Sequence, residues 1–365
     1  MAPLTPRPGI MDIAPYVGGQ SKDTSYKGKL SSNESAIGPC PAAVEAFKQA
    51  ADTLHRYPDG GSIELREALG QHYGLEADRL VCVSGSDDLL SMICRAYAGP
   101  GDEVIFGENA FLMYPISTMS VGATCVTVEE TEYRVNVDNI LAAVTERTKI
   151  VFITSPSNPT GTYTTKDELA RLYAGLPDHV VLVIDGAYAD FVTASDFDDG
   201  LELARTAENV LVTRTFSKIY GLAGLRLGWG YASAQIIDVI NRIRGPFNVG
   251  APSQAAGVAA LGDDTFFEAA RTHNDTWLAW LSEQISALGL FVVPSVANFV
   301  LIRFGSETEA QACDLFLQDR GYFLRRMDGY GFPDHLRLTV GAVDENEGVV
   351  AAMRSFIERP NREES

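Results

Sequence analysis

Positive charge is scarce in this sequence of 365 residues, in which 29 lysines and arginines stand against 48 aspartates and glutamates, for a formal net charge of −19. Unspecific binding to nucleic acid or to an anionic membrane requires clustered positive charge, so this balance argues against both. Cysteine is also sparse, because the five cysteines are widely spaced and form no CxxC pair and no Cys/His cluster. Neither a disulfide framework nor a metal site is therefore indicated.

Long apolar stretches are missing as well. No run reaches the about 18 apolar residues that a membrane-spanning helix needs. The first residues, MAPLTPRPGIMDIAPYVGG, lack the basic segment followed by an apolar one that marks a signal peptide. We therefore expect a protein of the reducing cytoplasm.

What the sequence does contain is a series of short apolar segments that alternate with helical patterns from residue 39 onward. Most are continuous runs of Val, Ile and Leu, which is typical of strands buried on both faces of a mostly parallel sheet. Helical stretches such as 166–176 would supply the crossovers. The expected strands are 80–84, 103–106, 124–128, 150–154, 180–185, 210–213 and 227–231. This pattern predicts the α/β class.

The length exceeds the roughly 250–300 residues that one core supports, so a large and a small domain are expected. We expect an N-terminal arm over residues 1–30, a large domain over 31–275 and a smaller α+β domain over 276–365. The boundary would lie within a long helical region, 253–288. Strands of the small domain are expected at 291–293, 299–304, 323–326 and 336–340.

In an open α/β sheet, ligands bind outside the carboxyl ends of the strands, and four unusual segments stand at such ends. In SGSDD, Gly85 permits a tight turn into a helix whose first N–H groups suit a phosphate. The alternative is an ordinary helix start capped by Ser86 or Asp87. In SPSNPTG, two prolines and a glycine present Asn158, whose amide can donate to a phenolate oxygen, although a plain turn would look the same.

The other two segments carry charge at strand ends. Asp185 ends the apolar strand VVLVID, a costly position for a carboxylate unless a cation such as a ring nitrogen lies opposite, although it could instead cap a helix. Tyr188 could reach the same ligand. In TRTFSKIYGLAGLRLGWGY, the apolar surroundings of Lys218 would lower the pKa of its amine, as imine chemistry requires. Arg226 suits bidentate phosphate binding.

In this order and spacing the four segments resemble fold-type-I pyridoxal-phosphate enzymes of the aspartate aminotransferase superfamily. More narrowly, the chain resembles the histidinol-phosphate aminotransferase family over nearly its whole length. The resemblance is carried above all by LHRYPDGGSIELREAL and RTFSKIYGLAGLRLGW, with KLSSNESAIGP, SGSDDLL, FLMYPI, VFITSPSNPTGT, RGPFNV, NFVLIRF and LRLTVG in support.

This resemblance implies roles around the ring of the cofactor. Lys218 would bind pyridoxal phosphate as a Schiff base and move the proton of the substrate. Asp185 would pair with the ring nitrogen, and Asn158 and Tyr188 would hydrogen-bond the ring hydroxyl oxygen. Phe111 would stack on the ring, although the Pro-Thr often found before this position is replaced by other residues.

It also implies residues at the phosphate of the cofactor. The backbone around Ser86 and Asp87 would bind it together with Ser217 and Arg226. Tyr57 would reach it from a partner subunit, so the resemblance implies a homodimer with shared active sites.

For the substrate, the resemblance implies that Arg337 binds a carboxylate or phosphate with the help of Arg325. Tyr16 and Phe247 would close the substrate site from the neighbouring chain. One departure is Gly186, where the family commonly has Glu, yet Asp185 and Tyr188 on either side are kept.

The expected reaction is transamination between L-histidinol phosphate and 2-oxoglutarate, giving imidazole-acetol phosphate and glutamate in histidine biosynthesis. The nearest alternative is an aromatic amino-acid aminotransferase acting on Phe or Tyr. A pyridoxal-phosphate lyase or decarboxylase would share the same cofactor residues. A non-enzymatic regulator on this fold is disfavoured by the acidic charge balance and by the want of a basic helix-turn-helix segment ahead of the domain.

Overall fold

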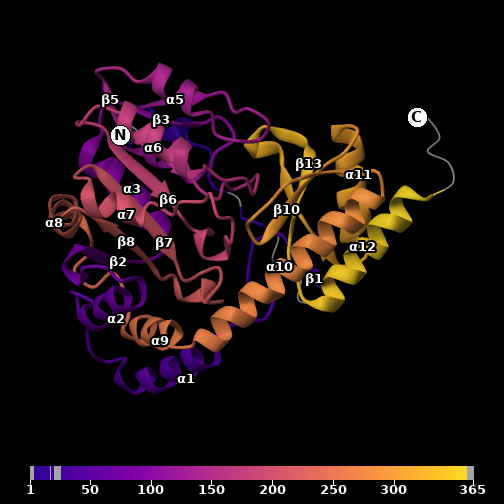
Figure 1. Cartoon of the computed structure of the whole chain (residues 1–365), viewed down its shortest axis with the longest axis horizontal. Helices are drawn as coiled ribbons and strands as arrows, with labels where there is room; N and C mark the ends of the chain where they lie inside the picture. The colour runs from indigo at the N-terminus through magenta and orange to yellow at the C-terminus, as the bar shows by residue number, and fades with distance from the viewer. Residues whose placement is uncertain (1–3, 17, 20–25, 360–365) are drawn as a thin grey trace.

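A seven-stranded sheet forms the centre of the larger of two bodies, seen at the left of Figure 1. The computed structural model describes residues 4–16, 18–19 and 26–359. The strand order is β2-β8-β7-β6-β5-β3-β4; β4, β3, β5, β6 and β7 are parallel, and β8 is antiparallel to both β7 and β2. The strands are β2 (Leu80–Val83), β3 (Glu103–Gly107), β4 (Thr124–Val128), β5 (Thr148–Thr154), β6 (Val181–Asp185), β7 (Val210–Thr215) and β8 (Gly228–Ala232). The prediction of a mostly parallel α/β sheet is confirmed.

Each face of this sheet packs into its own apolar core. Along β6, Leu182 and Ile184 belong to one core, whereas Val181 and Val183 belong to the other. Because successive residues of a strand point to opposite faces, a strand covered on both sides must be apolar throughout. The covering helices are α1 (Pro41–Ala50), α2 (Ile63–Tyr73), α3 (Ser86–Tyr97), α4 (Met113–Ser120), α5 (Val137–Ala143), α6 (Lys166–Gly175), α7 (Leu201–Thr206), α8 (Ala234–Ile243) and α9 (Ala251–Leu261).

The smaller body, yellow in Figure 1, is built on a four-stranded antiparallel sheet of order β12-β13-β10-β9. Its strands are β9 (Phe291–Val293), β10 (Phe299–Arg303), β12 (Arg325–Met327) and β13 (Phe332–Thr339), and helices α11 (Glu307–Gln318) and α12 (Val343–Ile357) pack beside it. The strand expected at 323–326 is divided into β11 (Tyr322–Phe323) and β12. Short strand β1 (Gly28–Lys29) pairs in parallel with β11, so a segment from near the N-terminus joins this body.

The helical region expected over 253–288 is two helices, α9 and α10 (Asp264–Ala287), separated at Gly262 and Asp263. The carboxylate of Asp263 accepts the N–H of Phe266 at 3.0 Å and so caps α10. Helix α10 runs from the base of the larger body to the smaller sheet (Figure 1). The domain boundary proposed near residue 275 falls within it.

The serine next to helix α2 does not cap it. Ser62 precedes the helix, but its backbone is left-handed, with φ 47°, and its side chain makes no capping bond. The carboxylate of Asp59 does this work instead, accepting the N–H of Ile63 at 2.7 Å and that of Gly61 at 2.9 Å.

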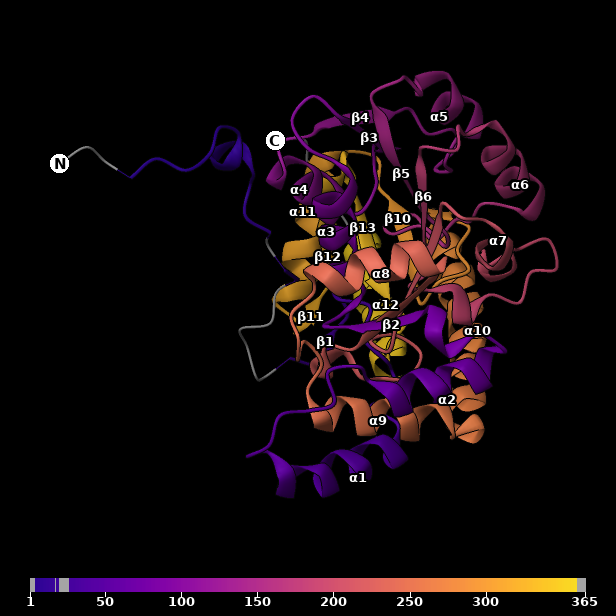
Figure 2. The ribbon, with the colours of Figure 1, turned by 90° about the vertical axis from the view of Figure 1, so that its left-hand side faces the viewer.

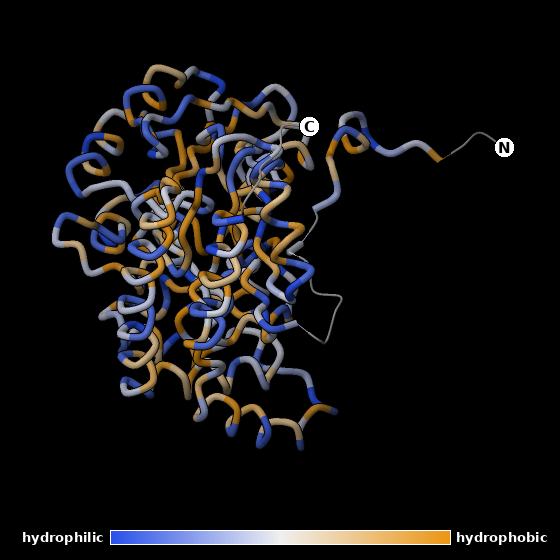
Figure 3. The backbone as a smooth tube through the Cα atoms, turned by 90° about the vertical axis from the view of Figure 1, so that its right-hand side faces the viewer, coloured by the Kyte–Doolittle hydropathy of each residue, from blue (hydrophilic) through white to orange (hydrophobic). Residues whose placement is uncertain are grey.

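The first described part of the N-terminal arm extends away from the rest of the molecule in Figures 2 and 3, whereas β1 near its end lies in the smaller body. It contains one 3-10 turn, Ile10–Asp12, and is tied to the larger body where the Arg7 guanidinium donates to the backbone carbonyl of Ser120. Among the described helices, none is both long and apolar enough to cross a membrane.

Candidate active site

A cavity of about 380 Å³ opens at the carboxyl ends of β5, β6 and β7, bounded on its other side by β12 and β13. Twelve of the residues that the sequence singled out line it: Tyr16, Ser86, Asp87, Phe111, Asn158, Asp185, Tyr188, Ser217, Lys218, Arg226, Arg325 and Arg337. The fold therefore brings together residues that are spread over most of the chain.

Lys218 lies in the loop after β7 and is half-buried. Its amine donates to the backbone carbonyls of Ser32 at 3.3 Å and Asn33 at 3.2 Å, and it stands 5.4 Å from the ring centroid of Tyr188. Burial, with the nearby charge of Arg337, lowers the pKa of this amine to about 8. Lys218 is thus no ordinary surface lysine.

Asp185 is buried at the end of β6, with only 3% of its surface exposed. Its carboxylate accepts hydrogen bonds from Tyr114 Oη at 3.1 Å, Thr213 Oγ1 at 3.2 Å and the N–H of Ala187 at 3.3 Å. These three donors are neutral, and burial raises the pKa of the carboxyl to about 6. A cation bound in the cavity would supply the counter-charge that the carboxylate of Asp185 lacks among these three donors.

Asn158 and Tyr188 are both buried beside the cavity. The carboxamide oxygen of Asn158 accepts from the guanidinium of Arg337, so its amide nitrogen is the group that can donate to a ligand. The hydroxyl of Tyr188 accepts from Asn33 Nδ2 at 2.9 Å, and burial raises its pKa. Tyr188 therefore keeps its proton at neutral pH.

The N-terminus of α3 faces the same cavity. Gly85 is the residue before the helix, with φ 93° and no side-chain capping bond, so the alternative of a cap by Ser86 or Asp87 is wrong. A Cβ at Gly85 would lie 2.2 Å from Arg226 Nη2, which explains the glycine. Arg226 is held by Asp87 at 2.6 Å and by Ser217 Oγ at 3.4 Å. N–H groups at a helix N-terminus, a hydroxyl and a guanidinium are groups that could together bind an anion.

Arg325 and Arg337 are directly opposite each other on β12 and β13. Arg337 is almost fully buried; its Nη2 donates to the carbonyl of Ser31 at 3.0 Å, and no hydrogen-bond partner is present for its Nε among the described residues. Burial lowers the pKa of Arg337. Two neighbouring guanidinium groups make this wall of the cavity suitable for an anionic substrate.

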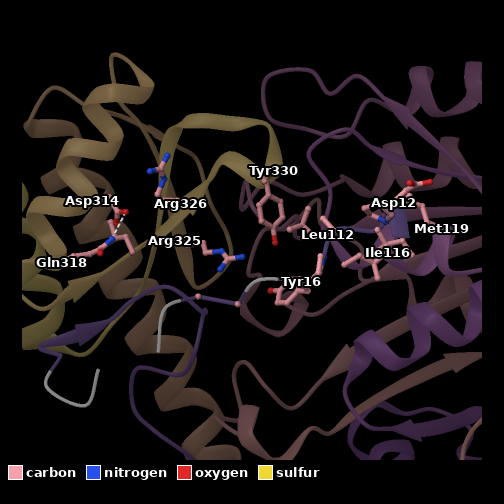
Figure 4. A pocket seen from close by; sticks show the side chains of 18 residues that line it. Asp12, Tyr16, Leu112, Ile116, Met119, Asp314, Gln318, Arg325, Arg326 and Tyr330 are labelled. Atoms are coloured by element: carbon pink, nitrogen blue, oxygen red, sulfur yellow. Dashed lines mark hydrogen bonds between the residues drawn. The ribbon is translucent and has the colours of Figure 1, made fainter. Parts of the chain in front are cut away.

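A second cavity, of about 580 Å³, adjoins the first through Tyr16, Arg325 and Tyr330. Figure 4 shows these three side chains between the smaller body and the apolar residues of α4, Ile116 and Met119. The resemblance implied that Tyr16 comes from a neighbouring chain, whereas within this single chain Tyr16 lines its own cavity.

Tyr57 and Phe247 do not line either cavity. Their rings stack on each other with centroids 4.6 Å apart, and 83% of Tyr57 and 46% of Phe247 are exposed. Within a single chain, Tyr57 and Phe247 therefore do not contribute to the site that the same chain forms.

Some residues of the site were not predicted, among them Asn33 and Tyr114. Asn33 bonds both Lys218 and Tyr188, and Tyr114 bonds Asp185. Their segments, KLSSNESAIGP and FLMYPI, belong to the family resemblance, which was the available signal. Neither residue stands at a strand end, so position in the sheet could not point to them.

The departure at Gly186 has a local explanation. A Cβ there would lie 3.0 Å from Nε of Arg214, which is buried and pairs with Asp190 at 3.1 Å and Asp199 at 2.8 Å. A glutamate would require the side chain of Arg214 to shift, so glycine suits the position in this chain.

Comparison with known proteins places this geometry in a family. The family described as aminotransferase class I and II matches residues 26–354. Histidinol-phosphate aminotransferase of Paramagnetospirillum magneticum is 54% identical over 98% of this chain and 99% of its own length, and that of Ruegeria pomeroyi is 51% identical over 98% and 99%. The crystal structure of histidinol-phosphate aminotransferase from Sinorhizobium meliloti in complex with pyridoxal 5′-phosphate is 26% identical, covers 98% of both chains and superposes with a TM-score of 0.90. The chain therefore belongs to the class I and II aminotransferases, and among them to the histidinol-phosphate aminotransferase group.

Proposed function

We propose that this chain is a pyridoxal-phosphate-dependent aminotransferase that uses L-histidinol phosphate and 2-oxoglutarate in histidine biosynthesis. The observation that carries the proposal is the meeting of Lys218, Asp185 and the free N-terminus of α3 around one cavity. The names of the relatives support the histidinol phosphate reaction, and the S. meliloti structure supports the cofactor.

The residues present fit this cofactor. Asp185 is a buried carboxylate whose protein partners are all neutral, so a protonated ring nitrogen would supply its missing counter-charge. The α3 N-terminus with Ser217 and Arg226 would hold the phosphate. Phe111 lines the same cavity and would cover the ring.

When bound, pyridoxal phosphate draws electrons from the substrate α-carbon into its ring. Lys218 Nζ is neutral above a pH of about 8 and can take up the α-proton and return it. The carbonyls of Ser32 and Asn33 hold the amine within the cavity while it is free. Asp185, buried beside Tyr114 and Thr213, would stabilise a positive charge on the ring nitrogen.

Arg337 and Arg325 would bind the anionic group of either substrate. A phosphate monoester and a carboxylate both accept paired hydrogen bonds from a guanidinium, which lets one wall serve two substrates in turn. The wider neighbouring cavity, which Tyr16 and Tyr330 help to line, would receive the remainder of the substrate.

We further propose a homodimer with shared sites and a large domain ending near residue 275. The exposed pair Tyr57 and Phe247 supports the first part, because rings this open to water in a single chain suit a subunit contact. Tyr57 would then reach the cofactor phosphate of the partner.

The aromatic amino-acid aminotransferase is the weaker alternative, since the close relatives bear the histidinol phosphate name. The deciding experiment compares kcat/KM for L-histidinol phosphate and L-phenylalanine with 2-oxoglutarate as acceptor, because that ratio reports differential transition-state binding. We expect a ratio well above one in favour of histidinol phosphate. A ratio below one would assign the aromatic activity instead.

A further inference from the structure

Asn33 lies at the junction of the two bodies, on the segment that follows β1. It is 1% exposed and adopts a left-handed backbone with φ 55°, which Asn tolerates better than most residues. The segment before it is fixed to the smaller body: Leu30 N–H donates to the carbonyl of Phe323 at 2.9 Å, and Thr339 N–H donates to the carbonyl of Leu30 at 3.0 Å. Asn33 therefore has a fixed position relative to β13.

The amide of Asn33 is oriented by Thr339. The backbone N–H of Asn33 donates to Thr339 Oγ1 at 3.0 Å, and that hydroxyl donates its own proton to Asn33 Oδ1 at 3.1 Å. With the amide oxygen engaged in this way, the NH₂ group faces Tyr188, at 2.9 Å from its hydroxyl oxygen. Asn298 holds the backbone carbonyl of Asn33 from the other side at 3.1 Å.

When a hydroxyl oxygen accepts a hydrogen bond from one neighbour, its own proton is free to be donated to another group. A phenolic O–H has one proton to give, and Asn33 can only donate to it from the NH₂ group. The proton of Tyr188 is therefore left to be donated into the cavity that its ring borders. An acceptor at position 33 would take that proton instead.

We infer that Asn33 is a positioning residue that fixes the Tyr188 hydroxyl as a hydrogen-bond donor toward the ring hydroxyl oxygen of the cofactor. This inference rests on the proposed function, because it requires a cofactor with an anionic ring oxygen in the cavity. The backbone carbonyl of the same residue anchors Lys218, so one residue of the N-terminal segment serves two groups of the site.

The test compares two non-covalent ligands on cofactor-free protein by titration calorimetry: pyridoxamine 5′-phosphate and its analogue without the ring hydroxyl. In the unaltered protein the hydroxyl should strengthen binding by about 10- to 100-fold, the range for a hydrogen bond to a charged group. Asn33→Asp, which offers Tyr188 an acceptor, should reduce this ratio several-fold, while the part that Asn158 contributes remains. Tyr188→Phe should reduce the ratio by the same factor. The variant with both changes should show no further reduction of the ratio than either change alone.

The matched control is Asn209→Asp, which removes an amide hydrogen bond of 2.7 Å to the carbonyl of Val180 at the opposite end of the sheet. It should keep the ratio of the unaltered protein. If Asn33→Asp keeps that ratio too, or weakens both ligands equally, the inference is overturned and Asn33 has only a structural role.

Should Asn33→Asp not fold, Thr339→Val and Thr339→Ser carry the test. Thr339→Val removes the hydroxyl that orients the amide of Asn33 and should lower the affinity ratio. Thr339→Ser retains the hydroxyl and should leave the affinity ratio unchanged. Equal ratios in the two variants would contradict the inference. Failure of the unaltered protein to bind pyridoxamine 5′-phosphate at all would overturn the proposed function itself, which is a distinguishable result.

Discussion

Lys218 and Asp185 are two side chains of the site whose pKa values are shifted in the direction that the proposed chemistry needs. Burial disfavours the charged form of each, so the lysine pKa falls to about 8 and the aspartate pKa rises to about 6. Sequence reasoning predicted both environments, because each residue follows or sits within an apolar run. The neutral partners, Tyr114 and Asn33, could not be predicted from local pattern, since they come from segments far away in the chain.

The first prediction concerns the reactivity of Lys218 in cofactor-free protein. The amine is protonated below a pH of about 8 and nucleophilic above it. Labelling with an amine-specific acylating reagent, followed by peptide mapping, should therefore give a half-maximal rate near pH 8 at Lys218. Nα-acetyl-lysine, with an ordinary pKa near 10.4, serves as the reference. A Lys218 profile that matches the reference would show that the amine is not desolvated.

The second prediction concerns Asp185→Asn. The folded pKa is raised above the unfolded value, so Asp185 favours the folded state only while protonated, and cofactor-free protein loses stability as the pH rises from about 4 through about 6. The loss is about 3 kcal/mol, from a shift of about two pKa units. Asn lacks this penalty, so above pH 6 the cofactor-free variant should unfold at higher urea concentration than the unaltered protein.

In the enzyme with bound cofactor, Asp185→Asn should instead reduce catalytic activity. Loss of the carboxylate leaves the ring nitrogen without its counter-charge, and breaking a buried ion pair costs about 3–5 kcal/mol. We expect kcat/KM to fall by about two to four orders of magnitude. A variant that retained full activity while gaining stability would exclude Asp185 as the partner of the ring nitrogen.

At the scale of elements, the strands of the larger sheet were predicted to within a few residues because most are continuous apolar runs between polar breaks. The break between α9 and α10 was missed, although Gly262 followed by Asp263 offered a stop signal and a cap. Ser62 stands next to α2 in the sequence, yet the carboxylate of Asp59, which reaches over from the preceding turn, accepts the first N–H of the helix. Caps depend on turn geometry, which adjacency in sequence does not define.

The third prediction tests the N-terminus of α3 as the phosphate site. Arg226→Ala removes the guanidinium beside that helix and should weaken pyridoxamine 5′-phosphate binding by about 10- to 100-fold, the worth of a charge-assisted hydrogen bond. Dephosphorylated pyridoxamine should bind the variant and the unaltered protein alike. Arg242→Ala removes an exposed arginine paired with Asp238 on α8 and is the control. Equal weakening of both ligands would place the phosphate elsewhere.

At the scale of the whole molecule, the sequence predicted the large sheet and the edge of it at which a ligand would bind. It did not predict that residues 28–34 pack against the smaller body. A two-residue strand has no periodicity to detect, and its pairing with β11 spans almost the length of the chain. Subunit contacts are likewise not a local property. The exposed Tyr57 and Phe247 indicate where a second chain would add to the site.

The fourth prediction tests shared sites by complementation. Lys218→Ala and Tyr57→Ala should each have little activity, but after unfolding and refolding as a mixture they should form hybrid dimers with one complete site. Random pairing makes half of the dimers hybrid, so the mixture should regain about a quarter of the unaltered activity. Unmixed samples treated in the same way are the control. A mixture no more active than the mean of its parts would show that Tyr57 does not act across subunits.

The central claim, that Lys218 carries pyridoxal phosphate, has a direct measurement. The enzyme is purified with the cofactor, reduced with borohydride to fix any imine, digested, and its peptides are sequenced by mass spectrometry. We predict one phosphopyridoxyl group per chain, on Lys218, and none in the Lys218→Ala variant. A label on another lysine, or no label on protein saturated with the cofactor, would contradict the account.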